Sequence, residues 1–360
     1  MGWCSWYQYD VHISADKIQG QAKALKTSGL YDAGYHYVNI DDGFFEGRAA
    51  DGTLLEDKTK FPSGMKATVD YIHRLGMKAG IYSDGGQNTC GSIWNNDKKG
   101  IGVGLYGHVT QDARLFFKDW GFDYIKVDWC GGKVLHLDDS ATYLNIIDTM
   151  RQIKPDLVFN LSRWQFPGIW AIKAADSWRV AVDIHNNFKE IQAIIDLSAN
   201  LWQYASPGHY NDMDMLQVGR GMSYEEDKTH FSMWCMLTSP LMISCDLQQI
   251  SPDSKEILTN KELIAIDQDN GFRQARRLIH EANGHIDVWV KPLGKKGKQK
   301  AIAVMNRADT AASYKVNPAL IGIKPTQKVR DLWLHKDMGP VQDLAAFSIP
   351  PHGVVVLKTY

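Results

Sequence analysis

Short apolar runs alternate with amphipathic stretches along the first two-thirds of the chain. The apolar runs are rich in Val, Ile and aromatic residues and predict eight β-strands, at residues 2–7, 34–44, 77–84, 123–130, 156–162, 177–184, 209–215 and 240–247. The stretches between them follow helical spacing, as in the series Ala113, Phe116, Phe117 and Trp120. Ser14 is the predicted N-cap of a helix that runs through Leu25 and is closed by Gly29.

The alternation of strands and helices predicts parallel strand pairing through right-handed crossovers. Eight such units fit a closed (β/α)8 barrel better than an open sheet, because a TIM barrel typically has about 250 residues. We therefore predict an α/β fold whose first domain, residues 1–268, is a (β/α)8 TIM barrel.

The pattern changes after about residue 270. The apolar runs become short and are separated by Lys- and Gly-rich turns; they are residues 285–292, 301–306, 329–334 and 353–359. Short strands between regular turns are typical of antiparallel sheets. We predict a second domain, residues 269–360, that is a C-terminal antiparallel β-sandwich.

Composition and charge exclude several classes of protein. The chain has 360 residues, and its 40 Lys and Arg against 41 Asp and Glu give a net charge of -1, without the electrostatic footprint of a nucleic-acid binder. No apolar run reaches the roughly 20 residues of a membrane helix. The five cysteines form no CxxC pair and the 12 histidines have no ligand spacing, so we expect no metal. These features predict a soluble protein without nucleic-acid or membrane partners.

A glycine-rich segment resembles a dinucleotide-binding motif. Residues 102–107 read GVGLYG and match the pattern GxGxxG. They follow the polar stretch WNNDKKG, whereas the dinucleotide motif follows a strand, and no acidic residue stands at the expected spacing beyond it. We therefore predict no dinucleotide cofactor.

Acidic residues collect at the carboxyl ends of the predicted strands. They are Asp41, Asp42, Asp84, Asp128, Asp183, Asp212 and Asp214. The active sites of TIM barrels are built at this end of the strands. Because buried carboxylates are costly without partners, their grouping on neighbouring strand ends predicts a polar ligand.

Two of these strand ends also carry a cation. Lys126 and Asp128 are two residues apart and face the same side of a strand, and Arg179 and Asp183 share a side in the same way. A cation beside a carboxylate favours the ionised form that a nucleophile requires, although structural ion pairs are the alternative. Two carboxylates across a pocket are what glycoside hydrolysis needs.

Six short motifs make the chain resemble glycoside hydrolase family 27, whose members are α-galactosidases and α-N-acetylgalactosaminidases. The motifs are MGWCSW (1–6), IDDG (40–43), GIYSD (80–84), KVDWC (126–130), RVAVD (179–183) and NDMDM (211–215). They occur in order at predicted strands. The resemblance covers essentially the whole length, including the C-terminal sandwich.

The resemblance implies a retaining mechanism without a cofactor or a metal. Asp128 would be the nucleophile and Asp183 the general acid/base of a double displacement, with their carboxyl groups about 5–5.5 Å apart. The implied sugar-binding residues are Trp6 against the apolar face, Tyr82 lining the pocket, Asp41 and Asp42 at the 6- and 4-hydroxyls, Lys126 near the 3- and 4-hydroxyls and Arg179 at the 2- and 3-hydroxyls.

The resemblance also implies a disulfide between Cys90 and Cys130 beside the pocket. A disulfide indicates an oxidising compartment, so we expect a secreted, periplasmic or lysosome-like location. No signal peptide precedes the first predicted strand, and we expect the sequence to be that of a trimmed chain.

The loop after the fifth predicted strand departs from the family pattern. Arg163 stands where family α-galactosidases usually carry a Glu that reads the 2-hydroxyl, and the N-acetylgalactosaminidases carry small residues there and three positions further on. Arg163 and Phe166 are both large, so we expect a plain 2-hydroxyl rather than a 2-acetamido group. Arg163 would bind near this hydroxyl or contact an extended aglycone.

We predict a retaining exo-acting α-galactosidase whose partner is a glycan with terminal α-linked D-galactose. The alternative within the family is a β-L-arabinopyranosidase, whose sugar lacks the C6 arm; Asp41 and Asp42 favour galactose. The alternative from another class is a carbohydrate-binding protein without activity. The presence of both Asp128 and Asp183 argues against it, because binding alone does not need both.

Overall fold

The computed structural model describes residues 1–281 and 283–360 of the chain. It divides into two compact units, which are Met1–Val182 with Met242–Ile250, and Asp183–Leu241 with Ser251–Tyr360. These units divide the chain at other points than the predicted domain boundary between residues 268 and 269, which stays a prediction. Each unit is described by itself below.

The barrel sheet has eight strands in the order β10-β1-β2-β5-β6-β7-β8-β9. Their bounds are β1 (Gly2–Cys4), β2 (Tyr37–Asn39), β5 (Lys78–Asp84), β6 (Tyr124–Asp128), β7 (Val158–Leu161), β8 (Ser177–Arg179), β9 (Tyr210–Asp212) and β10 (Met242–Ile243). β10 pairs in parallel with β1, so the last of these strands in the sequence lies beside the first. This order confirms the predicted (β/α)8 barrel, although each strand is shorter than its apolar run.

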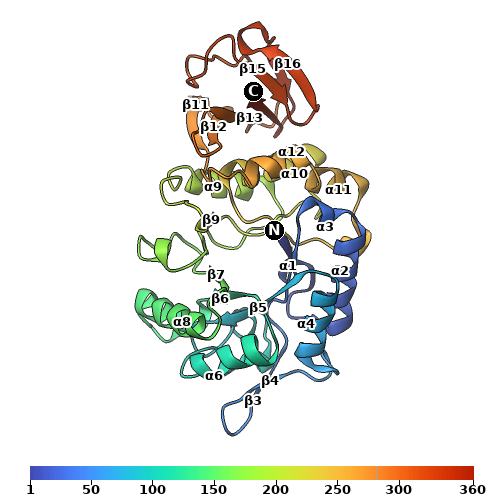
Figure 1. The fold of residues 1–360 in the computed structure, drawn as a ribbon, viewed down its shortest axis with the longest axis vertical. Coiled ribbons are helices and arrows are strands. Elements are labelled where there is room, and N and C mark those ends of the chain that lie inside the picture. Colours follow the sequence, from blue (N-terminus) through green and yellow to red (C-terminus); the bar gives the residue numbers. More distant parts are fainter. Residues whose placement is uncertain (282) are drawn as a thin grey trace. The chain divides into compact units, whose positions relative to one another are not determined.

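Helices of the first unit lie beside its own strands, and Figure 1 shows α4, α6 and α8 around β5, β6 and β7. The helices are α1 (Trp6–Tyr9), α2 (Ala15–Thr27), α3 (Leu30–Ala33), α4 (Gly64–Arg74), α5 (Cys90–Trp94), α6 (Val109–Arg114), α7 (Cys130–Val134) and α8 (Asp139–Ile153). α2 begins at its predicted N-cap, because Ser14 Oγ accepts the Lys17 N–H at 3.4 Å. The predicted helix around Phe116 is α6 continued by a π-helical turn, Leu115–Asp119.

An antiparallel hairpin that the sequence analysis did not predict follows β2. It consists of β3 (Phe45–Arg48) and β4 (Leu54–Glu56) and forms a separate two-stranded sheet. Polar residues at Glu46 and Arg48 break the apolar pattern that would have indicated a strand.

The second unit combines helices with an antiparallel sandwich. Its helices are α9 (Phe188–Ser198), α10 (Tyr224–Leu237), α11 (Pro252–Leu258) and α12 (Lys261–Asp267). A six-stranded sheet has the order β11-β12-β13-β18-β15-β16, and β14 pairs with β17. The strands are β11 (Arg276–His280), β12 (Ile286–Leu293), β13 (Gln299–Asn306), β14 (Ala312–Tyr314), β15 (Lys328–Asp331), β16 (Lys336–Pro340), β17 (Phe347–Ile349) and β18 (Val354–Thr359).

One apolar core lies between these two sheets. Val288, Ile302 and Leu357 from the large sheet and Ile349 from β17 are buried in the same cluster. The predicted C-terminal β-sandwich is therefore confirmed as part of the fold class.

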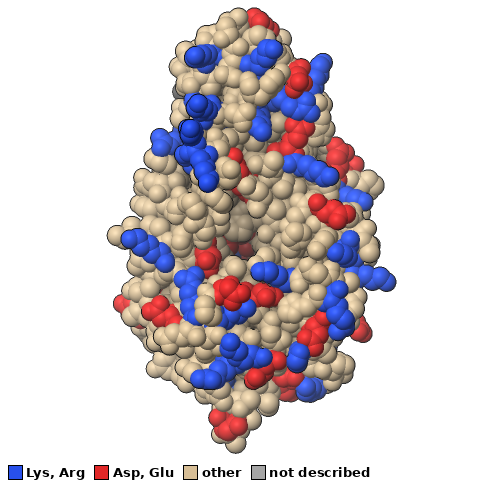
Figure 2. All heavy atoms as spheres, viewed as in Figure 1, with Lys and Arg blue, Asp and Glu red and all other residues tan. Residues whose placement is uncertain are grey.

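Charged side chains of both signs lie on the surface. Figure 2 shows Lys and Arg interspersed with Asp and Glu over the visible face. Among the described residues, every helix is too short or too polar to cross a membrane.

Candidate active site

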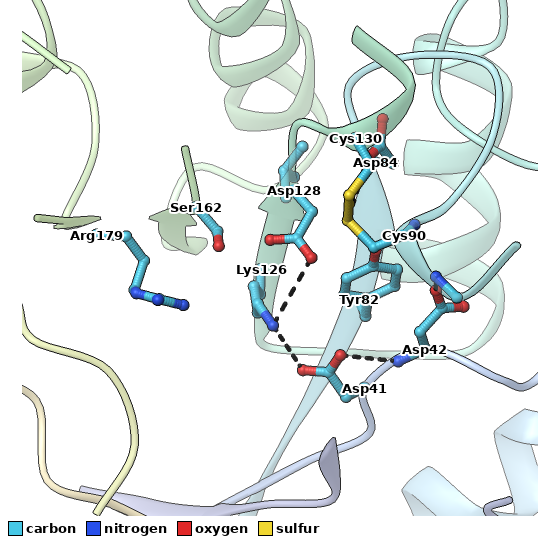
Figure 3. A network of polar contacts seen from close by, with 12 residues as sticks. Asp41, Asp42, Tyr82, Asp84, Cys90, Lys126, Asp128, Cys130, Ser162 and Arg179 are labelled. Atoms are coloured by element: carbon cyan, nitrogen blue, oxygen red, sulfur yellow. Dashed lines mark hydrogen bonds and ion pairs between the residues drawn. A yellow bond between two sulfur atoms is a disulfide. The ribbon is translucent and has the colours of Figure 1, made fainter. Parts of the chain in front are cut away.

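Asp128 ends strand β6 within a group of buried polar side chains (Figure 3). The register of β5 and β6 pairs Tyr82 with Lys126 and Asp84 with Asp128, so both carboxylates stand at the same end of the sheet. Lys126 Nζ lies 3.9 Å from Asp128 Oδ2 and donates a hydrogen bond to Asp41 Oδ2 at 3.0 Å. Lys126 therefore lies beside Asp128, as predicted, and it also forms an ion pair with Asp41.

Asp41 follows β2 and is held by the first strand of the barrel. Its backbone N–H donates to Ser5 Oγ at 2.9 Å, and the Cys4 thiol donates to Asp41 Oδ2 at 3.3 Å. Burial, followed by the charge of Asp41, raises the pKa of the Cys4 thiol well above its usual value, which keeps this donor protonated. The sequence analysis assigned no role in the site to Cys4 or Ser5, although both lie in the motif MGWCSW.

Asp42 is fully buried and is held by backbone donors. Its carboxylate accepts the Gly43 N–H at 2.7 Å and the Gly91 N–H at 2.8 Å. Burial raises the pKa of Asp42 to about 7 despite these bonds. Gly43 has a φ of 105°, and a Cβ there would lie 2.4 Å from the Val11 carbonyl oxygen, so the turn needs glycine.

Tyr82 connects this group to the loop after β5. Its Oη accepts the Cys90 N–H at 3.2 Å, and Lys126 Nζ lies 5.3 Å from the centre of its ring. Burial, followed by the charge of Asp128, raises the pKa of Tyr82 well above its usual value. Tyr82 is therefore a neutral side chain in this group, and its role in lining a pocket stays a prediction.

The predicted disulfide between Cys90 and Cys130 is present and joins α5 to α7. Asp84 lies beside it and accepts the N–H groups of Gly86 at 2.7 Å and Gly131 at 3.0 Å. Burial raises the pKa of Asp84 to about 7. Asp84 and the two sulfur atoms lie within metal-binding distance of one another, but the disulfide removes both thiolates, so this group does not fit a metal ion.

Arg179 and Ser162 approach Asp128 from the side opposite to Tyr82 (Figure 3). Arg179 ends β8, is buried, and donates from Nη2 to the Ala181 carbonyl oxygen at 3.1 Å. Ser162 follows β7; its buried Oγ forms no hydrogen bond with the part of the chain that the structure describes. The sequence analysis missed Ser162, because a serine after a strand carries no signal by itself.

Two further predicted site residues of the first unit, Trp6 and Arg163, are not labelled in Figure 3. Trp6 begins α1 and is half-buried. Arg163 forms an ion pair with Asp139 at the first turn of α8, with one-quarter of each side chain exposed. The sequence analysis did not predict Asp139 as its partner, because 23 residues separate the two and no sequence pattern indicates a contact over that distance.

Asp183 is the first residue of the second unit, where it is exposed. The residue after it, Ile184, donates its backbone N–H to Asp214 Oδ2 at 3.0 Å. Asp214 donates its own N–H to Asp212 Oδ1 at 2.9 Å. The acidic pair of the motif NDMDM therefore holds the backbone next to Asp183, a role that the sequence did not indicate.

Comparisons with known proteins identify the family of the chain. The family described as alpha galactosidase A matches residues 1–269, and the family described as alpha galactosidase C-terminal beta sandwich domain matches residues 283–359. Alpha-galactosidase A of Cellvibrio japonicus is 36% identical over 99% of this chain and 91% of its own. Alpha-galactosidase 2 of Arabidopsis thaliana is 37% identical over 98% of this chain and 87% of its own.

A solved structure is similar over the same length. The crystal structure of alpha-galactosidase I from Mortierella vinacea has a TM-score of 0.89 and 32% identity, and the match covers 100% of this chain and 96% of that one. The family matches, the full-length relatives and the buried carboxylates at the strand ends lead to one conclusion: the chain belongs to glycoside hydrolase family 27, the α-galactosidase family.

Proposed function

We propose that the protein is a retaining exo-acting α-galactosidase, which releases terminal α-linked D-galactose from oligosaccharides or glycoconjugates. Relatives named alpha-galactosidase, 36% and 37% identical over nearly the whole chain, support this substrate. The observation that carries the proposal is the position of Lys126 between Asp41 and Asp128. The ammonium group of Lys126 thereby stabilises Asp41, which would bind sugar hydroxyls, and Asp128, which would attack the anomeric carbon.

The proposed reaction has two displacements. Asp128 attacks the anomeric carbon while Asp183 gives its proton to the glycosidic oxygen, so the aglycone leaves protonated and a galactosyl ester forms on Asp128. Water then attacks the same carbon, its proton passes to Asp183, and Asp128 leaves as a carboxylate. Two inversions at one carbon give net retention. Lys126 supports the first step because a cation near a carboxylate stabilises its charged form.

The proposed sugar contacts follow from the buried polar groups. Asp41 and Asp42 would accept hydrogen bonds from the 6- and 4-hydroxyls, and Lys126, which already donates to Asp41, would bind near the 3- and 4-hydroxyls. Arg179 would donate to the 2- and 3-hydroxyls, and Trp6 would lie against the apolar face of the ring. A site built to hydrogen-bond a hydroxyl discriminates strongly against a sugar that lacks it.

Arg163 is the residue that we expect to determine which substituent at C2 of the sugar can bind. Its ion pair with Asp139 supports a fixed, large side chain in the loop after β7. Together with Phe166 it would exclude a 2-acetamido group and leave room for a hydroxyl. We propose that Arg163 binds near the 2-hydroxyl, with contact to the aglycone as the second possibility.

The experiment is a comparison of initial rates on three 4-nitrophenyl glycosides: the α-D-galactoside, the α-N-acetyl-D-galactosaminide and the β-L-arabinopyranoside. We expect the α-galactoside to be hydrolysed fastest. Asp128→Asn should lower its kcat by at least about 10³-fold, because the amide cannot form the ester intermediate. Asp70→Asn is the matched control, since Asp70 is an exposed carboxylate that pairs with Lys66 on α4. Its rates should equal those of the wild-type protein.

Each other outcome contradicts a defined part of the proposal. A preference for the arabinopyranoside would contradict the assignment of Asp41 and Asp42 to galactose. Hydrolysis of the acetamido sugar would contradict the role of Arg163 and Phe166. Binding of galactose without turnover of any glycoside would contradict the enzymatic function and favour a carbohydrate-binding protein.

Two further points belong to the proposal. The disulfide supports an oxidising compartment, so a secreted, periplasmic or lysosome-like location is proposed. We also propose residues 1–268 as the catalytic domain and residues 269–360 as the sandwich domain, and the matched ranges 1–269 and 283–359 support this division.

A further inference from the structure

The loop between β5 and α6, residues 85–108, folds back on itself beside the site. Residues 100–106, here termed the return segment, are hydrogen-bonded to the residues that leave β5. Leu105 N–H donates to the Asp84 carbonyl at 2.9 Å, Gly104 N–H to Gln87 at 2.9 Å, and Thr89 N–H to Gly100 at 3.1 Å. The two arms of the loop therefore form one backbone-bonded unit.

The glycines of the GVGLYG sequence permit this close approach. A Cβ on Gly104 would lie 2.2 Å from the Gly86 carbonyl oxygen, and Gly102 has a φ of 74°. The close approach at position 104 therefore requires glycine, and the positive φ at position 102 favours it. The spacing that resembled a dinucleotide motif is thus explained by the packing of the return segment.

Arg48 on β3 binds the outer side of the return segment. Its Nε donates to the Gly102 carbonyl at 3.0 Å, and its Nη2 donates to the carbonyls of Val103 at 3.0 Å and Gly104 at 2.9 Å. Asp112 on α6 accepts from Nη1 at 2.8 Å and from Nη2 at 2.6 Å. The side chains of Arg48 and Asp112 are 9% and 0% exposed, so water competes little for these bonds.

The arm opposite the return segment supplies two backbone donors to the site. Gly91 N–H donates to Asp42 Oδ2 at 2.8 Å, and Cys90 N–H donates to Tyr82 Oη at 3.2 Å. The disulfide fixes Cys90 to Cys130, whereas the return segment is held from outside by Arg48. A shift of the loop by a few tenths of an ångström would weaken both donors, because hydrogen bonds depend steeply on distance and angle.

We propose that Arg48 is a positioning residue of the sugar site, which holds the return segment so that the Gly91 N–H keeps Asp42 in its binding geometry. This inference rests on the proposed function, in which Asp42 binds sugar hydroxyls. The planar guanidinium binds three successive carbonyls and a carboxylate at once. A lysine ammonium has three donors on one atom and cannot span this set.

The test compares Arg48→Met and Arg48→Lys with the wild-type protein on the 4-nitrophenyl α-D-galactoside and β-L-arabinopyranoside. Arg151→Met is the matched control, because Arg151 also joins a carbonyl, that of Ala174 at 2.6 Å, to a carboxylate, that of Asp176 at 2.9 Å. All rates are measured at least about 10 °C below the Tm of each variant, so that loss of folded protein does not enter.

We expect Arg48→Met to raise KM for the galactoside by about tenfold, the effect of one weakened hydrogen bond, with kcat changed less than about threefold. KM for the arabinopyranoside should rise as well, because Asp42 is placed at the 4-hydroxyl, which both sugars carry. Arg48→Lys should behave almost as poorly as Arg48→Met. Arg151→Met should leave both KM values unchanged.

Hydrogen exchange without substrate separates this inference from the proposed function. The Gly91 and Leu105 amides should exchange faster in Arg48→Met and at the wild-type rate in Arg151→Met. Unchanged exchange, or equal loss on both glycosides in all variants, would overturn the positioning role. If the wild-type protein hydrolyses neither glycoside, the proposed function fails, and the exchange of Gly91 still decides whether Arg48 holds the loop.

Discussion

Lys126 places a single positive charge between two carboxylates. Its Nζ lies 3.0 Å from Asp41 Oδ2 and 3.9 Å from Asp128 Oδ2. Two unit charges about 4 Å apart attract by about 4 kcal/mol at an effective dielectric constant of about 20, before the cost of burying them is counted. The charge of Lys126 therefore stabilises the ionised forms of both carboxylates, and its hydrogen bond fixes Asp41.

Asp42 and Asp84 are buried in a different way, since backbone N–H groups bind them. Burial raises the pKa of each carboxyl to about 7. The site thus combines one carboxylate pair that shares a cation with two carboxyls that become charged only near neutral pH.

Asp84→Asn should weaken the dependence of stability on pH. The folded protein holds a proton on Asp84 that the unfolded chain, with a pKa of 3.8, releases. This contribution to stability is complete below pH 3.8 and is lost as the pH rises through about 7. The Tm at pH 5 minus the Tm at pH 8, measured by circular dichroism, should fall by about 2–4 °C in the variant.

The control for this prediction has a pKa shifted in the opposite direction. Although burial raises it, the hydrogen bond from Lys99 lowers the pKa of Asp57 to about 2. Its contribution is lost only as the pH falls through about 2, so Asp57→Asn should leave the difference between pH 5 and pH 8 unchanged. Equal changes in both variants would refute the assignment of the shift to Asp84.

At the level of elements, the order of the strands could be predicted and their lengths could not. The apolar run 34–44 indicates a strand, but Gly34 has a φ of 113° and β2 is confined to Tyr37–Asn39. After β2 the chain leaves the strand conformation and places Asp41 and Asp42 in the candidate site, so the last part of the apolar run forms the site rather than the strand. The hairpin of β3 and β4 escaped prediction because Glu46 and Arg48 interrupt its apolar pattern, and the carbonyl groups that bind Arg48 lie 54 to 56 residues away. The periodicity of apolar residues indicates the secondary structure of one element and does not indicate hydrogen bonds between residues far apart in the sequence.

Removal of the disulfide between α5 and α7 should destabilise the protein. The bond closes a loop with a sequence separation of 40, for which the chain-entropy estimate is about 3–4 kcal/mol. The double variant Cys90→Ser/Cys130→Ser should therefore unfold at a lower urea concentration, and dithiothreitol should lower the midpoint of the wild-type protein in the same way. Dithiothreitol should not affect the double variant. A wild-type midpoint that does not respond to reduction would contradict the structural role of the bond.

At the level of the whole molecule, acidic residues connect elements in both units. In the second unit Asp196 on α9 accepts from Arg277 at 2.5 Å and from Arg307 at 2.7 Å, which binds a helix to the sandwich strands. The pattern of apolar runs predicted the sandwich, but such pairs depend on side chains that meet only after folding.

The candidate site shows the same limit. The strand ends identified Asp41, Asp42 and Asp128, because parallel strands gather their carboxyl ends at one side of a barrel. The hydrogen-bond donors to these carboxylates, such as Gly91 N–H and Cys4 Sγ–H, belong to other elements. No pattern in the sequence indicates them.

The central claim is that Asp128 is the nucleophile of a retaining α-galactosidase, and one measurement tests it most directly. Asp128→Gly is incubated with 2,4-dinitrophenyl α-D-galactoside and sodium azide, and the product is identified by proton NMR. Azide can enter the space of the missing carboxylate and attack the face of the sugar that Asp128 would attack. We predict β-galactosyl azide and a rate restored by azide. Formation of α-galactosyl azide would make Asp128 the acid/base instead, and the absence of any azide product would contradict its place at the anomeric carbon.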